Sequence, residues 1–124
     1  MYIRREMLSG LAPKERQFNN AVVILEKVLS HVPSYTVTIA TMAELNHGRR
    51  TFGPPDDQTI CVLFYGKDHA VYAIWQSPDE VFHLRQIKPR NGNPEDVGYY
   101  IVNDCRDGEK FSDIMKYLIG HKIF

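Results

Sequence analysis

The chain has 124 residues, of which 44% are hydrophobic and 11% aromatic, a length and composition typical of one independently folding domain. Its 15 Lys and Arg residues balance 15 Asp and Glu residues, so no long-range positive field exists to attract nucleic acid or an anionic membrane. We therefore expect a single domain over residues 1–124, without general nucleic-acid binding and without membrane attachment.

The two cysteines, Cys61 and Cys105, lack CxxC spacing, and the N-terminal residues do not form a signal peptide. This pattern indicates reduced thiols, although a single disulfide stays open as the alternative. No apolar stretch approaches the length that a membrane-spanning helix requires. We therefore expect a cytoplasmic protein.

The first predicted element is an amphipathic helix that follows a flexible or partly ordered arm over residues 1–12. Apolar residues recur at helical spacing from Phe18 to Leu29, Pro13 suits the first turn, and Pro33 ends the helix. Alternating β-branched residues then predict a strand over residues 34–41. A short helical turn at 42–45 and a long surface loop at 46–58 complete the first half.

The second half reads as a run of strands followed by a helix. Strands are predicted at 59–65, 69–76 and 81–88, and their short connections make them antiparallel neighbours. A loop at 90–96 leads to a strand at 97–103, and residues 104–108 turn the chain into the last helix. Apolar residues recur there at helical spacing, namely Phe111, Ile114, Met115, Leu118 and Ile119, and Gly120 ends the helix.

This order of elements predicts an α+β fold. We expect an antiparallel sheet of about five strands with an N-terminal and a C-terminal helix packed on it. The apolar Ile123-Phe124 after the last helix predicts extra burial, either within the chain or across a homodimer.

Residues of about 59–119 resemble the later part of a Src-homology-2 domain. The segment Val81-Phe82-His83 leads to an Asn91-Gly92 turn and an aromatic strand at 98–101, and the closing helix carries Phe111, Ile114 and Leu118. The resemblance implies recognition of a phosphotyrosine peptide. The sequence departs from the family at residues 61–64, where Cys-Val-Leu-Phe stands in place of the phrase with the phosphate-gripping arginine, so the usual route of phosphotyrosine recognition is in doubt.

Five cationic side chains are the candidate ligand-binding residues. His83 and Arg85 lie two apart on one predicted strand and therefore point to the same side. Arg90 follows at the strand end, and Arg49 and Arg50 lie in the long loop. Guanidinium groups bind phosphate or carboxylate in a bidentate manner, so these residues form an anion site if loop and strand converge. The alternative is a solvated sheet face that carries scattered cations.

The motifs of common enzymes are absent from the sequence. His69 opens a predicted strand in a way that is similar to the catalytic histidine of papain-like proteases, but neither Cys61 nor Cys105 stands at the start of an upstream helix. The five histidines lack metal-ligand spacing, and there is no phosphate-binding glycine loop. We therefore assign no catalytic residue, no metal and no cofactor.

These observations predict a non-enzymatic protein- or peptide-recognition module for an acidic or phosphorylated ligand, bound through Arg49, Arg50, His83 and Arg85. The alternative is a binder of a small phosphorylated or nucleotide ligand, or a phosphoester-cleaving enzyme with His69 or His83 as acid or base.

Overall fold

The computed structural model describes residues 15–47 (side chains from Asn19 onward), 59–90 and 98–124. The predicted arm, most of the long loop with Arg49 and Arg50, and most of the second loop lie outside the described residues. The elements in chain order are α2 (Glu15–Leu29), a 3-10 helix (Ser34–Thr36), β1 (Val37–Thr41), α3 (Met42–Asn46), β2 (Ile60–Tyr65), β3 (Val71–Gln76), β4 (Phe82–Pro89), β5 (Tyr99–Gly108) and α4 (Phe111–Gly120).

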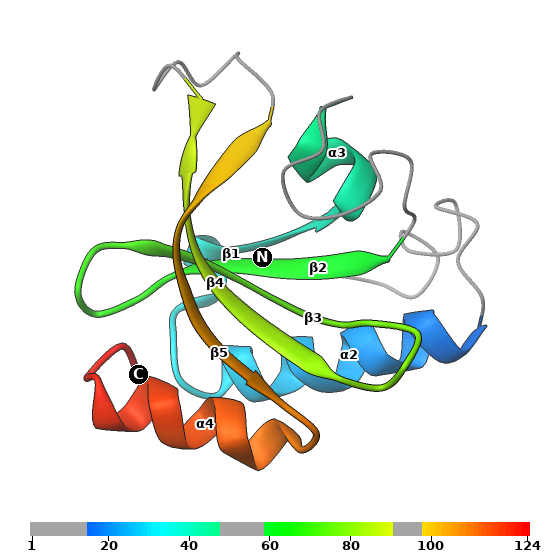
Figure 1. Cartoon of the computed structure of the whole chain (residues 1–124). Helices are drawn as coiled ribbons and strands as arrows, with labels where there is room; N and C mark the ends of the chain where they lie inside the picture. The colour runs from blue at the N-terminus through cyan, green and yellow to red at the C-terminus, as the bar shows by residue number, and fades with distance from the viewer. Residues whose placement is uncertain (1–14, 48–58, 91–97) are drawn as a thin grey trace.

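The five strands form one antiparallel sheet in the order of the chain, β1-β2-β3-β4-β5 (Figure 1). Tight turns join the central strands. The Gly66 N–H donates to the Ala70 carbonyl between β2 and β3, and the Ser77 N–H donates to the Val81 carbonyl between β3 and β4, both at 2.9 Å. The predicted α+β fold with an antiparallel sheet of about five strands is therefore confirmed.

Helices α2 and α4 both cover one face of the sheet, which we call the two-helix face (Figure 1). Ile24 and Val28 of α2 and Ile114 and Leu118 of α4 are fully buried there. They pack against strand residues such as Phe64. The apolar periodicity of each helix thus has a direct structural cause, because one stripe of each faces the sheet.

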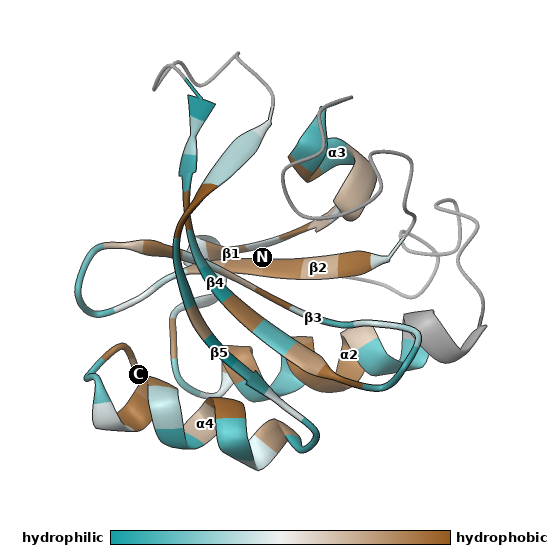
Figure 2. Ribbon diagram, in the orientation of Figure 1, coloured by the Kyte–Doolittle hydropathy of each residue, from teal (hydrophilic) through white to brown (hydrophobic). Residues whose placement is uncertain are grey.

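The opposite face, which we call the α3 face, carries a second and smaller core. Met42 and Leu45 of α3 pack there against Leu63, Trp75 and Ile87. The helix is held at its start by a capping box, in which Thr41 and Glu44 exchange hydrogen bonds. Figure 2 shows that β2 is hydrophobic along most of its length, as expected for a strand buried on both faces.

Strand β5 is longer than predicted. Residues 104–108, which the sequence predicts as a turn, continue the strand to Gly108 and pair with β4. Register shifts occur between Leu84 and Gln86 and between Gln86 and Ile87. Cys105 lies within this strand and not in a turn. It adopts φ 42° in the irregular stretch.

Three further boundaries differ from the predictions. Residues 34–36 form a 3-10 helix, so β1 begins only at Val37. The third predicted strand begins at Val71, because His69 adopts φ 65° in the preceding turn. Helix α2 ends at Leu29, four residues before Pro33.

The C-terminal residues return to the core of the chain. Ile123 and Phe124 are buried, and the Phe124 ring stacks on His31 with a centroid distance of 4.6 Å. The Lys67 N–H donates to the Ile123 carbonyl at 2.8 Å and ties this segment to the β2–β3 turn. The extra burial predicted for Ile123-Phe124 is therefore found within the chain.

Candidate functional site

His83 and Arg85 lie on the same side of β4, as predicted from their spacing. Arg85 Nη2 and His83 Nδ1 are 3.5 Å apart. Both side chains lie against Trp75, whose ring centroid is 5.2 Å from that of His83 and 5.6 Å from the Arg85 guanidinium carbon. Strand alternation and the pairing of Trp75 with His83 place these three side chains together on the α3 face.

The Arg85 guanidinium already has acceptors on the neighbouring strand. Its Nη1 donates to the Asp107 carboxylate at 2.7 Å and to the Asp104 carbonyl at 2.9 Å, and its Nε lies 3.5 Å from the Asp104 carboxylate. The side chain is only 13% exposed. An incoming anion would therefore have to displace Asp107 before it could bind Arg85 in a bidentate manner.

Asp107 is the common partner of the two predicted cations. Its Oδ1 lies 2.8 Å from His83 Nδ1 and 2.7 Å from Arg85 Nη1. Burial raises the pKa of Asp107, but the hydrogen bonds from Arg85 and His83 outweigh it and hold this pKa below its ordinary value. The carboxylate is thus ionised at neutral pH and holds the His83 ring in one orientation.

Ser77, in the β3–β4 turn, contacts the other ring nitrogen of His83. The distance from Ser77 Oγ to His83 Nε2 is 2.9 Å. The same hydroxyl also hydrogen-bonds to the Asp79 carboxylate and lies 3.1 Å from the Val81 carbonyl. Ser77, His83 and Asp107 therefore form a continuous hydrogen-bonded series from the β3–β4 turn through β4 to β5.

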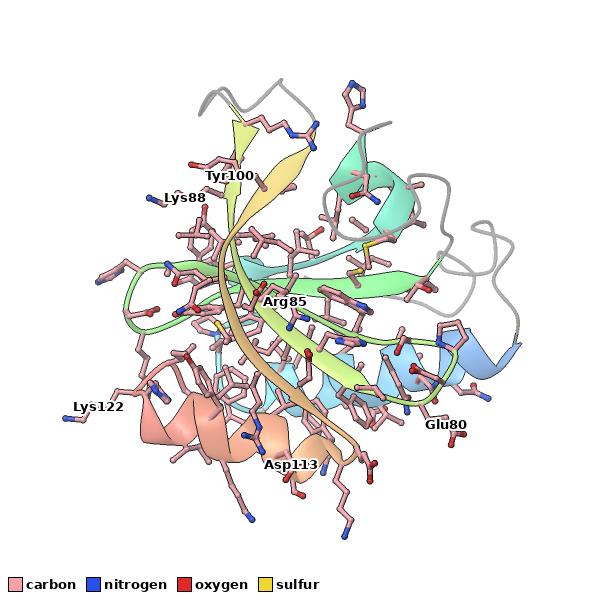
Figure 3. All side chains as sticks on the ribbon, viewed as in Figure 1. Glu80, Arg85, Lys88, Tyr100, Asp113 and Lys122 are labelled. Carbon is pink, nitrogen blue, oxygen red and sulfur yellow. The ribbon has the colours of Figure 1, made fainter. Side chains whose placement is uncertain are left out.

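The remaining predicted site residues are not brought to this cluster. Figure 3 shows Arg85 near the middle of the sheet, whereas Lys88 lies toward the far end of β4. Arg90 follows that end, where its N–H donates to the Gly98 carbonyl at 3.2 Å. Arg49 and Arg50 lie outside the described residues. His69 lies in the exposed β2–β3 turn.

A second feature is a cavity on the α3 face, at the opposite end of the strands from Ser77. Its volume is about 80 Å³, and it opens to solvent. It is lined by Thr36, Thr38, Leu63, Phe64, Tyr65, Val71, Pro89 and Tyr99. These residues come from the 3-10 helix and from all five strands, so only the folded sheet assembles the cavity.

Two tyrosines border this cavity and differ in exposure. Tyr65 is 55% exposed, whereas Tyr99 is half-buried. Burial raises the pKa of Tyr99, and ionisation of the neighbouring Tyr65 acts in the same direction. The Tyr99 phenol is therefore neutral at physiological pH and can donate a hydrogen bond.

The Cys105 thiol is not activated by its surroundings. Cys61 and Cys105 form no disulfide with each other. Burial raises the pKa of Cys105, against the opposing influences of Tyr117, Gln86 and Arg85. Its neutral thiol is therefore the favoured form near neutral pH. In ranges 15–47, 59–90 and 98–124, no cluster of three or more His, Cys, Asp or Glu side chains is arranged to hold a metal ion.

Sequence reasoning missed Ser77, Asp107 and the cavity. The segment from Ser77 to Glu80 reads as a simple turn, and Asp107 falls in a stretch predicted to be a turn. Asp107 is paired with His83 by the register of β4 and β5, which the alternation within one strand does not reveal. The one local signal of the cavity was Tyr65, which lies exposed at the end of a buried run of strand residues.

Comparison with protein-family models, with curated proteins and with solved structures finds no match. The resemblance to Src-homology-2 domains therefore remains a sequence-based expectation. Among the helices of the described part of the chain, none is long and apolar enough to cross a membrane.

Proposed function

We propose that this domain is a protein- or peptide-recognition module that binds an extended segment of its partner at the β1 edge and holds one apolar side chain of that segment in the cavity on the α3 face. The size of this cavity carries the proposal. The exposed aromatic surface beside the cavity and the difference between the two edges of the sheet support it.

The cavity volume matches one side chain and not a cofactor. Pockets for drug-sized ligands measure about 300–1,000 Å³, and a cavity of about 150 Å³ accommodates benzene. A volume of about 80 Å³ suits a small aliphatic group. The volume therefore favours the peptide ligand over the alternative of a nucleotide or another small phosphorylated molecule at this place.

Tyr65 provides exposed contact surface beside the cavity. Tyrosine supplies a large, rigid and partly apolar surface with a polar tip, and such residues dominate binding energy at protein interfaces. Tyr65 is 55% exposed, so a partner side chain in the cavity would cover the Tyr65 ring as well. Exposed aromatic surface next to an anchoring pocket is typical of a protein-binding site.

The two edges of the sheet differ in a way that favours pairing at β1. An edge strand exposes backbone donors and acceptors, and proteins commonly protect such edges with charges, bulges or proline. Strand β5 has these devices, because it carries Asp104, Arg106 and Asp107 and shifts register against β4. Strand β1 (Val37–Thr41) has no charge and no proline, and it pairs with β2 over five consecutive residues without a shift.

In the part of the chain that the structure describes, β1 is an edge strand of the sheet, and the cavity lies beside it. Thr38 of β1 lines the cavity and is exposed. A segment paired with β1 would place every second side chain on the α3 face beside Thr38, within reach of the cavity. Main-chain hydrogen bonds would then give affinity, and the cavity would give specificity, as in other domains that bind peptides by strand addition.

A second copy of the chain is a poorer occupant than a different partner. If two β1 strands paired, each would present Thr38 and Ala40 to the α3 face. Neither side chain is large and apolar enough to fill about 80 Å³. The homodimer is therefore less suited to this site than a heterologous segment with a larger aliphatic residue.

The preference for an acidic or phosphorylated partner is the finer part of the proposal. Arg85 is already held by Asp107 and Asp104, so this preference depends on Arg49, Arg50 and Arg90. Replacement of Arg49 and Arg50 together by alanine should weaken the binding of acidic peptides more than that of neutral ones. Equal loss for both kinds of peptide would remove the preference from the proposal.

The experiment is selection of peptides from a random displayed library on the full chain, followed by calorimetry with synthetic peptides. Tyr65→Ala should weaken binding at least about tenfold, the scale of an interface hot spot. Ile119→Ala, an exposed apolar residue of α4 on the two-helix face, is the matched control and should leave affinity unchanged.

Methylation of peptide amide nitrogens tests the strand-addition mode separately. Because only alternate residues of an antiparallel strand bond to its neighbour, methylation should weaken binding at alternate positions. If affinity is insensitive to every methylation but sensitive to Tyr65→Ala, the cavity is retained and the strand mode is wrong. If no peptide is enriched, the recognition proposal itself fails.

A further inference from the structure

The Ser77–His83–Asp107 series has the connectivity of a serine nucleophile with its base. Ser77 Oγ lies 2.9 Å from His83 Nε2, and His83 Nδ1 lies 2.8 Å from Asp107 Oδ1. A carboxylate accepts hydrogen bonds only, so Nδ1 is the donor to Asp107. With that tautomer, Nε2 of a neutral ring is the atom that can take the proton of the serine hydroxyl.

The His83 ring is positioned from several sides. Its face stacks on Trp75 with an interplanar angle of 27°. Arg85 donates to the same Asp107 oxygen that accepts from the ring. A base held in this way by packing and by a supported carboxylate meets the geometric requirement for general-base chemistry, which is a hydrogen bond to the hydroxyl that loses its proton.

The Asp79 carboxylate contacts the same Ser77 hydroxyl that contacts His83. The Ser77 hydroxyl donates to this carboxylate, and Asp79 itself is exposed in the turn. The hydrogen bond from Ser77 is the main cause that lowers the pKa of Asp79, although desolvation acts in the opposite direction. An acceptor other than His83 is thus already in place for the proton of the Ser77 hydroxyl.

We propose that Ser77 is a nucleophile toward carboxylic esters, with His83 as its general base and Asp107 as the residue that orients His83, and that the Asp79 carboxylate masks this site. The Ser77 hydroxyl has one proton, which is directed to the Asp79 carboxylate, to the Val81 carbonyl or to His83 Nε2. While it is directed to Asp79, His83 does not act on it.

The reaction is acyl transfer. Ser77 Oγ bonds to the ester carbonyl carbon while its proton moves to His83 Nε2 and the electrons of the carbonyl double bond move to the carbonyl oxygen. The alcohol then leaves with the proton from His83. Water, deprotonated by the same base, releases the acid and restores the serine hydroxyl.

This inference is independent of the recognition function. The nucleophile lies where β3 joins β4, whereas the cavity lies where β2 joins β3. Because Asp79 masks Ser77, the chain can bind a peptide in its resting state without cleaving an ester.

The test is covalent labelling of the full chain by an alkyl fluorophosphonate, read by intact-protein and peptide mass spectrometry. The probe loses fluoride when a serine oxygen bonds to its phosphorus, and the serine proton passes to the base. Asp79→Ala should be labelled at Ser77 at least about tenfold faster than the wild type. Adding His83→Gln should lower this rate about 100-fold or more, the usual contribution of a general base.

The controls distinguish a Ser77 that is activated by His83 from a Ser77 that is only exposed to the probe. Ser112 is an exposed serine at the start of α4 and gives the background rate. Labelling of Ser77 in Asp79→Ala at the Ser112 rate, or at a rate unaffected by His83→Gln, would overturn the proposal. Asp79→Asn, which removes the charge and keeps the size, provides a second variant if Asp79→Ala loses its circular-dichroism spectrum. The same order of rates is expected for it, and hydrolysis of p-nitrophenyl acetate should follow that order.

Discussion

The guanidinium of Arg85 donates to the carboxylate of Asp107 across β4 and β5, with 2.7 Å between Nη1 and Oδ1. This contact lies beside the register shift that follows Leu84. It therefore joins the two strands where their regular ladder is interrupted, and it neutralises a cation that the sequence alone assigns to ligand binding.

Replacement of Asp107 by alanine should lower the free energy of unfolding by about 1–3 kcal/mol, because Arg85 and His83 both lose an acceptor and Arg85 is largely buried. Urea denaturation at pH 7 measures the change. Asp104→Ala is the matched control, since its carboxylate is 85% exposed and 3.5 Å from Arg85 Nε. Its effect should stay within about 0.5 kcal/mol. Equal effects of the two substitutions would contradict the role given to Asp107.

The contribution of Asp107 should also depend on pH. Its pKa is lowered in the folded chain, so its stabilising effect is present above the unfolded value of about 3.9 and is lost as the pH falls through the lower folded value. The stability difference between the wild type and Asp107→Asn should therefore shrink below about pH 4. Denaturation curves at pH 7, 4 and 3 test this, and a constant difference would argue against it.

Tyr72 should make the fold sensitive to alkali. Burial, followed by the hydrogen bond that its phenol donates to Asp68, raises the pKa of Tyr72 far above its ordinary value. The unfolded chain therefore ionises first, and stability that is present below about pH 10 is lost as the pH rises above it.

The variant Tyr72→Phe isolates this contribution. At pH 8 it should be less stable than the wild type by about 1 kcal/mol, the usual net contribution of one hydrogen bond. Between pH 8 and pH 11 the variant should lose less stability than the wild type. If both lose the same amount in chemical denaturation, ionisation of Tyr72 does not control the alkaline stability.

Phe124 should be a major contributor to stability although it is the last residue of the chain. It packs on Phe64 with a centroid distance of 5.3 Å and stacks on His31. Phe124→Ala should cost about 3–5 kcal/mol, the range for large-to-small changes in a core. Ile119→Ala, 56% exposed, should change stability by about 0.5 kcal/mol or less. Thermal unfolding of both variants compares them, and equal melting temperatures would show that Phe124 is not a core residue.

Several elements could be predicted because their signals are local. The spacing of Ile114 and Leu118 predicts a helix with one buried stripe, and both residues are fully buried in α4. Alternation likewise predicts that His83 and Arg85 share a side. The end of β5 could not be predicted, because Asp104 to Asp107 have the composition of a turn and become a strand only through pairing with β4.

The sequence by itself therefore determined the helices, most strands and the side to which each strand residue points, since these follow from the periods of the backbone. Only the tertiary structure decided which side chains meet. Asp107 reaches His83 across 24 positions of sequence, and the cavity joins Thr36 to Tyr99. Such partners depend on strand register and on turn geometry, and a shift of one residue would move every strand side chain to the other face.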